Sequence, residues 1–281
     1  MITNSITTGS AAATRRRARL SVVGLAVGTV LVVLALMAAG YFSLSNLPLV
    51  SRPAALPAPP PTSPAADWDL AAEAALATRP MRVLPPEASA PQPLAQRPAS
   101  GGVHLPAPTG DLAGVPAGFP QTPEGAVAAL AALTTQGLQG ADPQTYTRAY
   151  RAVASPGAPP AEQARLVNLI ASLRASAGIP PTGPVAGLVM GWRPQQAQVK
   201  GVVDGGHYVV VCVLGQFSAD YQGRVITYGV GDCQAMRWIT TDPGSGAAGQ
   251  WLIAPGPAAA TAPDAWPGSQ DSVDAGYEEI R

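Results

Sequence analysis

The 281-residue chain has 17 basic and 17 acidic side chains, so its formal net charge is zero, and charged residues make up only 12% of it. This composition excludes the basic surface that nucleic-acid binding needs, and we expect no direct contact with nucleic acid. The 31 prolines and 30 glycines break regular structure over long stretches, which leaves room for one modest folded domain.

Residues 20–44, LSVVGLAVGTVLVVLALMAAGYFSL, form an apolar run without a charge. As a helix, a run of this length crosses a hydrocarbon core of roughly 30 Å. Basic residues lie just before it at Arg15, Arg16, Arg17 and Arg19, and the next one is Arg52. The positive-inside rule then places residues 1–19 in the cytoplasm. We predict a single-pass protein of the cell membrane whose remainder lies outside the cytoplasm, with the lipid bilayer as its first partner.

Two further interpretations concern this apolar run. A signal peptide cleaved near the small residues 38–40 is the alternative to an anchor, although the run exceeds the 7 to 15 residues typical of a signal peptide. Within the run, Gly24 and Gly28 form a G-x-x-x-G spacing that lets two membrane helices approach closely. A homo-oligomer formed through this motif is one expectation. The alternative is that the two glycines only reflect how common glycine is in membrane helices.

Residues 45–117 are rich in proline and alanine and are predicted to be an extended linker. Inside this linker, residues 66–78 (ADWDLAAEAALAT) have the pattern of a short helix. An isolated helix of this length is marginal in water. It is therefore either a docking segment or a transient helix.

Residues 118–256 are predicted to be the folded domain, and its first half has three amphipathic helices. The predicted helices begin at Thr122 before Pro123, at Asp142 before Pro143, and at the pair Pro159 and Pro160. Ser, Thr and Asp are good N-caps, and proline fits the first helical position. Glycines near residues 137–140, 157 and 178 end the helices.

The second half of the domain has the β-branched, turn-punctuated pattern of strands. We expect strands over residues 185–192, 196–203, 207–217, 224–228, 232–240 and 251–254. The Gly229 to Gly231 break suggests a β-bulge. The predicted fold class is α+β, with three helices packed on a curved antiparallel sheet.

The two cysteines, Cys212 and Cys233, flank the predicted turn at residues 220–223. Pairing about that turn sets Cys212 opposite a residue near 231, and a bulge brings Cys233 into register. A disulfide that staples the hairpin is the favoured interpretation for an extracytoplasmic domain. Two buried free thiols are the alternative. The tail, residues 257–281, is predicted to be disordered, with Trp266 and Tyr277 as contact points for a partner.

Recognisable catalytic chemistry is missing from the sequence. No zinc-ligand spacing, phosphate-binding loop or nucleophile–base pair is written in it, so we expect no enzyme activity, metal or cofactor. A bent sheet under three helices can enclose a conical cavity. The polar or aromatic candidates to line it are Asp204, His207, Tyr228, Asp232 and Trp238. For each of these, a role as a turn, edge or core residue is the alternative.

The order of the predicted elements resembles the NTF2-like fold as used in VirB8-type components of conjugation and type IV secretion machines. The segments GVPAGFPQTPEGAVAALAAL, GDCQAMRW and WLIAP are similar to an actinobacterial family of membrane-anchored proteins associated with integrative mobile elements. The resemblance spans about residues 114–256. It implies a non-catalytic envelope scaffold that binds other envelope or secretion-apparatus proteins. A ligand-binding sensor that uses the cavity and an NTF2-type enzyme are the alternatives.

Overall fold

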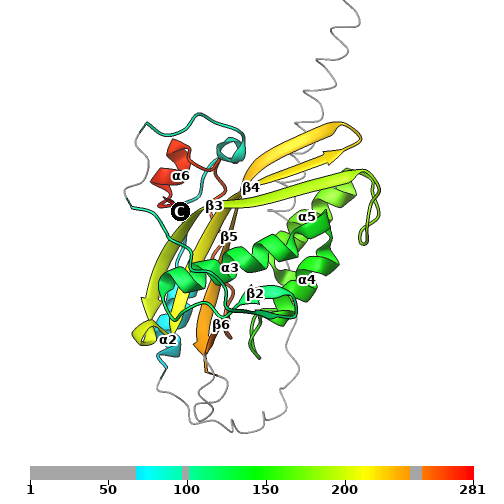
Figure 1. Ribbon diagram of the computed structural model, residues 1–281. Coiled ribbons are helices and arrows are strands. Elements are labelled where there is room, and N and C mark those ends of the chain that lie inside the picture. Colours follow the sequence, from blue (N-terminus) through cyan, green and yellow to red (C-terminus); the bar gives the residue numbers. More distant parts are fainter. Residues whose placement is uncertain (1–67, 97–100, 241–248) are drawn as a thin grey trace, which may run out of the picture. The chain divides into compact units, whose positions relative to one another are not determined.

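The computed structural model describes residues 68–96, 101–240 and 249–281 (Figure 1). The predicted cytoplasmic tail, the membrane helix with Gly24 and Gly28, and residues 45–67 of the linker lie outside the described residues. Within the described ranges, every helix is too short or too polar to cross a bilayer. The chain divides into residues 1–62 and 63–281, and only the second unit is described below.

The fold is α+β with a curved antiparallel sheet, as predicted. The sheet has five strands in the order β6-β5-β4-β3-β7. Its long members are β3 (Leu188–Val203), β4 (Tyr208–Tyr221) and β5 (Arg224–Ile239), and the short edge strands are β6 (Gln250–Ile253) and β7 (Glu278–Glu279). Two pairs of predicted strands are thus single continuous strands, β3 and β5.

The three predicted helices are present as α3 (Pro123–Gly137), α4 (Pro143–Ala152) and α5 (Arg165–Ser176). The Thr122 side chain accepts a hydrogen bond from the backbone N–H of Gly125, and Asp142 accepts one from Gln144. Both predicted N-caps are therefore confirmed. The 3₁₀ turn η3 (Ala161–Gln163) precedes α5, which has no side-chain cap.

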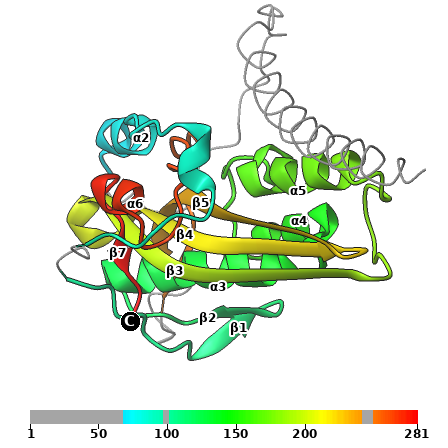
Figure 2. The same cartoon turned by 90° about the horizontal axis from the view of Figure 1, so that it is seen from above.

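Strand β4 is buried on both faces, because its two alternating sets of side chains enter different cores. Val209, Val211 and Val213 join the core formed with α3, α4 and α5. Val210, Cys212 and Leu214 face α2 (Leu70–Thr78) and the C-terminal segment. Figure 2 shows α3 on one side of the long strands and α2 with α6 (Gln270–Asp274) on the other. The second face is covered by this same chain, and no second subunit is needed to bury it.

The structure corrects the linker prediction from residue 68 onward. This region forms α2, the 3₁₀ turn η1 (Pro86–Ser89) and a two-stranded sheet of β1 (Gly110–Leu112) and β2 (Val115–Ala117). Leu76 and Ala77 of α2 are buried beside Val210. A short helix is marginal in isolation, but here the sheet offers the segment an apolar surface.

The predicted disordered tail is also wrong, because residues 257–281 pack onto the sheet. Tyr277 is fully buried, and its hydroxyl donates a hydrogen bond to the Pro263 carbonyl at 3.0 Å. Strand β7 pairs with Gln196 and Ala197 of β3. The tail is rich in small residues that fit closely against a sheet, and Tyr277 is a core residue of this chain instead of a contact for a partner.

The predicted bulge at Gly229 to Gly231 does not occur, since the register of β5 with β4 runs without a shift. The glycines instead make room for the C-terminal segment: a Cβ atom at Gly229 would lie 1.7 Å from the carbonyl oxygen of Ala265. The register shifts are in β3, between Pro194 and Gln196 and between Val199 and Gly201. Bulges of this kind bend a sheet, so β3 is the strand that contributes the curvature.

Candidate functional site

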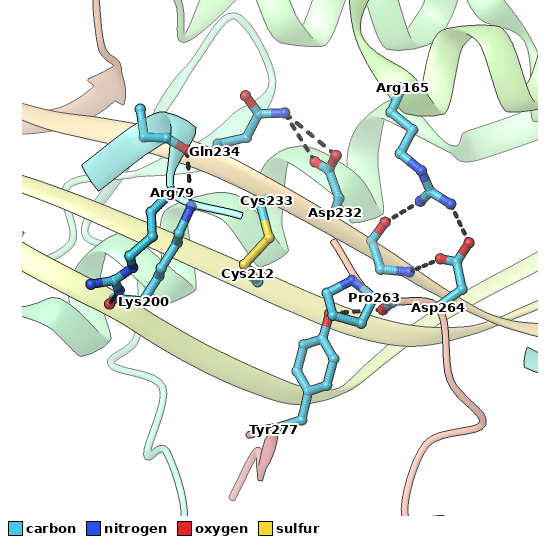
Figure 3. The surroundings of a disulfide bond; sticks show 12 residues. Arg79, Arg165, Lys200, Cys212, Asp232, Cys233, Gln234, Pro263, Asp264 and Tyr277 are labelled. Carbon is cyan, nitrogen blue, oxygen red and sulfur yellow. Dashed lines mark hydrogen bonds and ion pairs between the residues drawn. A yellow bond between two sulfur atoms is a disulfide. The ribbon is translucent and has the colours of Figure 1, made fainter. Parts of the chain in front are cut away.

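Cys212 and Cys233 form a disulfide at the centre of the sheet (Figure 3). They are directly opposite each other on β4 and β5, with their Cα atoms 4.0 Å apart. The predicted pairing is confirmed, but its cause differs from the prediction. Gln222 and Gly223, both with positive φ, form a two-residue hairpin turn that lies slightly further along the chain than predicted. This turn alone brings the cysteines into register.

The residues proposed to line one conical cavity lie at separate places. Asp204 and His207 belong to the β3–β4 connection, and Trp238 packs edge-on against Trp251 with ring centroids 5.5 Å apart. Tyr228 is on the outer part of β5 and is 37% exposed. Asp232 lies in the wall of the cavity that runs along the edge of β5. The other four lie in a turn, on a strand or in the core, and their role in lining a cavity stays a prediction.

Asp204 does belong to a buried polar cluster that holds α2 on the sheet. Glu73 of α2 forms an ion pair with Arg237 of β5, and both side chains are 5% exposed. The Arg237 guanidinium lies 4.8 Å from the ring centroid of Trp68 and 5.5 Å from that of Tyr208. Cation–π contacts of this kind are strengthened by burial. The cluster therefore fixes α2 by charge and by stacking together.

A second carboxyl group changes the protonation of this cluster. Burial and a hydrogen bond with Asp204 raise the pKa of Glu73 to about 7, and the same hydrogen bond lowers the pKa of Asp204. Oε1 of Glu73 and Oδ2 of Asp204 are both buried, and neither has a hydrogen-bond donor among the described residues. One proton held between the two carboxyl groups satisfies both oxygens, because two buried carboxylates this close cannot both ionise cheaply. The cluster can hold a proton, but it presents no nucleophile.

A cavity of the described domain lies along the edge of β5 and has a volume of about 200 Å³. Polar groups on its wall come from Tyr150 of α4, Arg165 at the start of α5, and Asp232 and Gln234 of β5; residues 258–262 of the C-terminal segment complete it. Burial raises the pKa of Asp232 to about 6, against the lowering effect of its Gln234 hydrogen bond and of Arg165. This wall therefore includes a carboxyl group that titrates in the weakly acidic range.

Arg165 and Asp264 fasten the C-terminal segment at one end of this cavity (Figure 3). Arg165 donates to the Gly231 carbonyl and to the Asp264 carboxylate, and Asp264 accepts from the Gly231 N–H at 2.8 Å. The pair therefore occupies the backbone groups of an exposed strand edge, which natural sheets commonly protect. Sequence reasoning missed Arg165, because a basic residue at a helix start has no motif that signals such a contact.

Comparison with known protein families, with curated proteins and with solved structures finds no match. Within the described ranges, no group of three His, Cys, Asp or Glu side chains is arranged to hold a metal ion. The features that the described residues do present are a buried cluster of Glu73, Asp204 and Arg237 that holds α2, a disulfide and a small polar cavity.

Proposed function

We propose that this chain is a non-catalytic, bitopic envelope scaffold whose ordered domain is held outside the cytoplasm and binds other envelope proteins. The observation that carries the proposal is the docking of α2. This helix is the first element described after the apolar N-terminal run, and the buried ion pair of Glu73 and Arg237 ties it to the sheet. Tension from a membrane anchor would therefore pass into the core of the domain.

The disulfide supports the predicted compartment. Stable disulfides are typical of oxidising compartments and rare in the cytosol, and Cys212 and Cys233 account for both cysteines of the chain. The finer proposal is an NTF2-like domain in a VirB8-like component of a conjugation or type IV secretion apparatus. Helices α3 to α5 against a curved antiparallel sheet support that analogy, as does the sequence resemblance. Self-association through Gly24 and Gly28 is part of the same proposal.

The outer end of the three long strands offers a surface for a partner. Val189 of β3 and Val225 of β5 are 68% and 65% exposed, and both are opposite Asp220 of β4, in one row across the sheet. Two exposed apolar side chains that flank a carboxylate offer a partner both apolar contact and a charge. This row is where a partner would be sought first.

Photocrosslinking in the native cell tests the scaffold. A photoreactive amino acid at Val225 is expected to crosslink the full chain to other envelope proteins, among them transfer-apparatus components. The same residue at Val83, 88% exposed on another part of the domain, is the matched control. Recovery of no envelope protein from Val225, or equal recovery from both positions, would count against the scaffold.

A ligand-binding sensor is the second candidate, and the cavity beside β5 favours it. The cavity is smaller than the 300–1,000 Å³ typical of drug-sized ligands, so its ligand would be small. A ligand-dependent rise in the melting temperature of the full chain would support this function. A melting temperature that no small polar compound changes would count against it.

A further inference from the structure

The edge of β5 is paired on both sides of Cys233 but not at Cys233 itself. On one side, the Ala254 N–H donates to the Ala235 carbonyl at 2.8 Å. On the other side, Asp264 accepts from the Gly231 N–H at 2.8 Å, and Arg165 donates to the Gly231 carbonyl. The chain thus leaves the edge after Ala254 and returns to it at Asp264.

The backbone groups of Cys233 point to this gap. Residues two apart on a strand direct their N–H and C=O groups to the same side, so Cys233 follows Gly231 and Ala235 toward the edge. The pairing of Cys233 with Cys212 supports this direction. The two residues are opposite each other with their Cα atoms 4.0 Å apart, which is typical of an antiparallel pair that exchanges no backbone hydrogen bonds. The N–H and C=O of Cys233 therefore point away from β4. Among the described residues, neither backbone group of Cys233 has a partner across this edge.

The gap coincides with the cavity. Cys233 lines the cavity of about 200 Å³, and so does Tyr150, whose hydroxyl makes no hydrogen bond to the described part of the chain. Cys233 is 7% exposed and Tyr150 is 2% exposed. Buried backbone N–H and C=O groups in native proteins nearly always have a partner. An unpaired N–H and C=O in one wall of a cavity therefore define what an occupant must offer: one acceptor and one donor, spaced as in a peptide group.

The charges of the wall favour a neutral occupant. Arg165 is already bound to Asp264 and to the Gly231 carbonyl, so it offers little to a free carboxylate. Asp232 accepts hydrogen bonds from Gln234 at 3.2 and 3.4 Å and from the Tyr146 hydroxyl at 3.4 Å, so both of its oxygens already have donors from the chain. A charged ligand would be desolvated without a free counter-charge, which is costly.

We propose that the edge of β5 at Cys233 binds one neutral amide group, which pairs with the Cys233 N–H and C=O as an added strand would. The amide belongs either to an extended peptide segment or to a small free carboxamide. The proposal deepens the ligand-binding candidate and rests on it; the scaffold does not depend on it.

Selective labelling makes the test simple, because the chain has two cysteines. The full chain in detergent, labelled with ¹⁵N-cysteine, gives two backbone amide signals. The Cys212 amide points to β3, away from the cavity, and serves as an internal control. The probes are N-acetyl-alanine methylamide for a peptide and propionamide for a free carboxamide. The control compound is methyl propionate, the ester analogue of the second probe, which has no N–H to donate to the Cys233 carbonyl.

The expected result is a saturable shift of the Cys233 signal with one or both amides, with Cys212 unmoved and the ester weaker. The Tyr150→Phe variant is expected to weaken binding roughly two- to tenfold. Tyr208→Phe, another buried tyrosine that does not line the cavity, is expected to leave it unchanged. The Cys212 signal reports whether each variant is folded.

An unmoved Cys233 signal at saturating concentrations of both amides would overturn the proposal. Equal shifts with the ester would overturn it as well. If acetate or methylammonium raised the melting temperature without moving the Cys233 signal, the amide class would be rejected while the ligand-binding function stood. Crosslinking at Val225 tests the scaffold separately, so failure of either proposal is recognised on its own.

Discussion

Glu73 and Arg237 lie 164 residues apart in the sequence, yet they form an ion pair whose side chains are each 5% exposed. Glu73 belongs to a region with linker composition, and Arg237 belongs to the central sheet. This contact makes α2, which lies in a proline-rich segment, part of the folded domain.

Removing one member of this pair should be costly. Arg237→Ala leaves the Glu73 carboxyl buried without its partner, and breaking a buried pair in this way typically costs about 3–5 kcal/mol. We expect a loss of this size in the free energy of unfolding by urea, with faster tryptic cleavage after Arg82, which follows α2. Arg151→Ala, which breaks a surface pair with Glu162, should cost less than about 1 kcal/mol. Equal losses in the two variants would contradict the assigned role of α2.

Stability should fall as the pH rises through the weakly acidic range. The folded pKa of Glu73 is about 7 and that of Asp232 is about 6, both above the ordinary pKa values of 4.5 and 3.8 for these side chains. At pH values between the ordinary pKa and the folded pKa of each group, the folded state binds more protons than the unfolded state. The free energy of unfolding therefore falls as the pH rises. The stabilisation is complete below about pH 4 and is lost by about pH 7.

Urea unfolding at a series of pH values checks this slope. The Glu73→Gln variant keeps the shape of the side chain and cannot ionise, so its decline should end near pH 6, where Asp232 has titrated. A wild-type stability that rises between pH 5 and pH 7 would show that the two carboxyl groups do not share a proton.

Gly229→Ala should loosen the C-terminal segment. The added Cβ would lie 1.7 Å from the Ala265 carbonyl oxygen and 2.9 Å from the Cα atom of Trp266, so the backbone has to move. Overpacking of this kind typically costs about 1–3 kcal/mol. Gly110→Ala is the control, because a Cβ there meets nothing within 4 Å. Hydrogen exchange should show faster exchange in residues 257–281 for Gly229→Ala alone.

Arg174 is fully buried and ties two loops to α5. Its guanidinium donates to the carbonyls of Pro180, Ala141 and Gly183 at 2.7, 2.8 and 2.7 Å. Lysine cannot reproduce the planar fork of donors, so Arg174→Lys leaves at least one buried carbonyl unpaired. We expect a loss of about 1–3 kcal/mol in the free energy of unfolding. Arg148→Lys, at an exposed position, should change it little, and a similar effect of both variants would refute this role.

Reduction of the Cys212–Cys233 disulfide should destabilise the domain. The bond joins residues 21 positions apart, for which the chain-entropy model gives about 3 kcal/mol. Urea unfolding with and without dithiothreitol measures the difference. The double variant Cys212→Ala, Cys233→Ala should show no response to the reductant. An intact domain that reductant does not destabilise would remove the argument for a structural disulfide.

The local signals of the sequence predicted the central elements well. The helix starts at Thr122 and Asp142 are written in residues next to each other, because an N-cap and a following proline act locally. The cysteine pairing was also predictable, since a hairpin links nearby positions. The register was misjudged because the turn lies at Gln222 and Gly223, and a shift of a single residue changes every cross-strand pair.

The errors share a different cause: distant segments that cover the second face of the sheet. Neither α2 nor residues 257–281 has a strong pattern of its own, and both become ordered because the sheet buries them. Gly229 and Gly231 suggested a bulge. The sequence does not distinguish a glycine that leaves room for a distant backbone segment from a glycine that bends a strand. The cavity beside β5 was likewise not foreseen in this form, because Arg165 and Tyr150 meet Asp232 only after the helices have packed.

The claim that the ordered domain is held outside the cytoplasm by a membrane anchor is tested most directly with a reporter. Arg281 is exposed at the end of the chain, so alkaline phosphatase, which is active only after export, can be fused there. The account predicts phosphatase activity in the membrane fraction. An inactive fusion present at equal amount, or an active one recovered entirely as a soluble species, would contradict it.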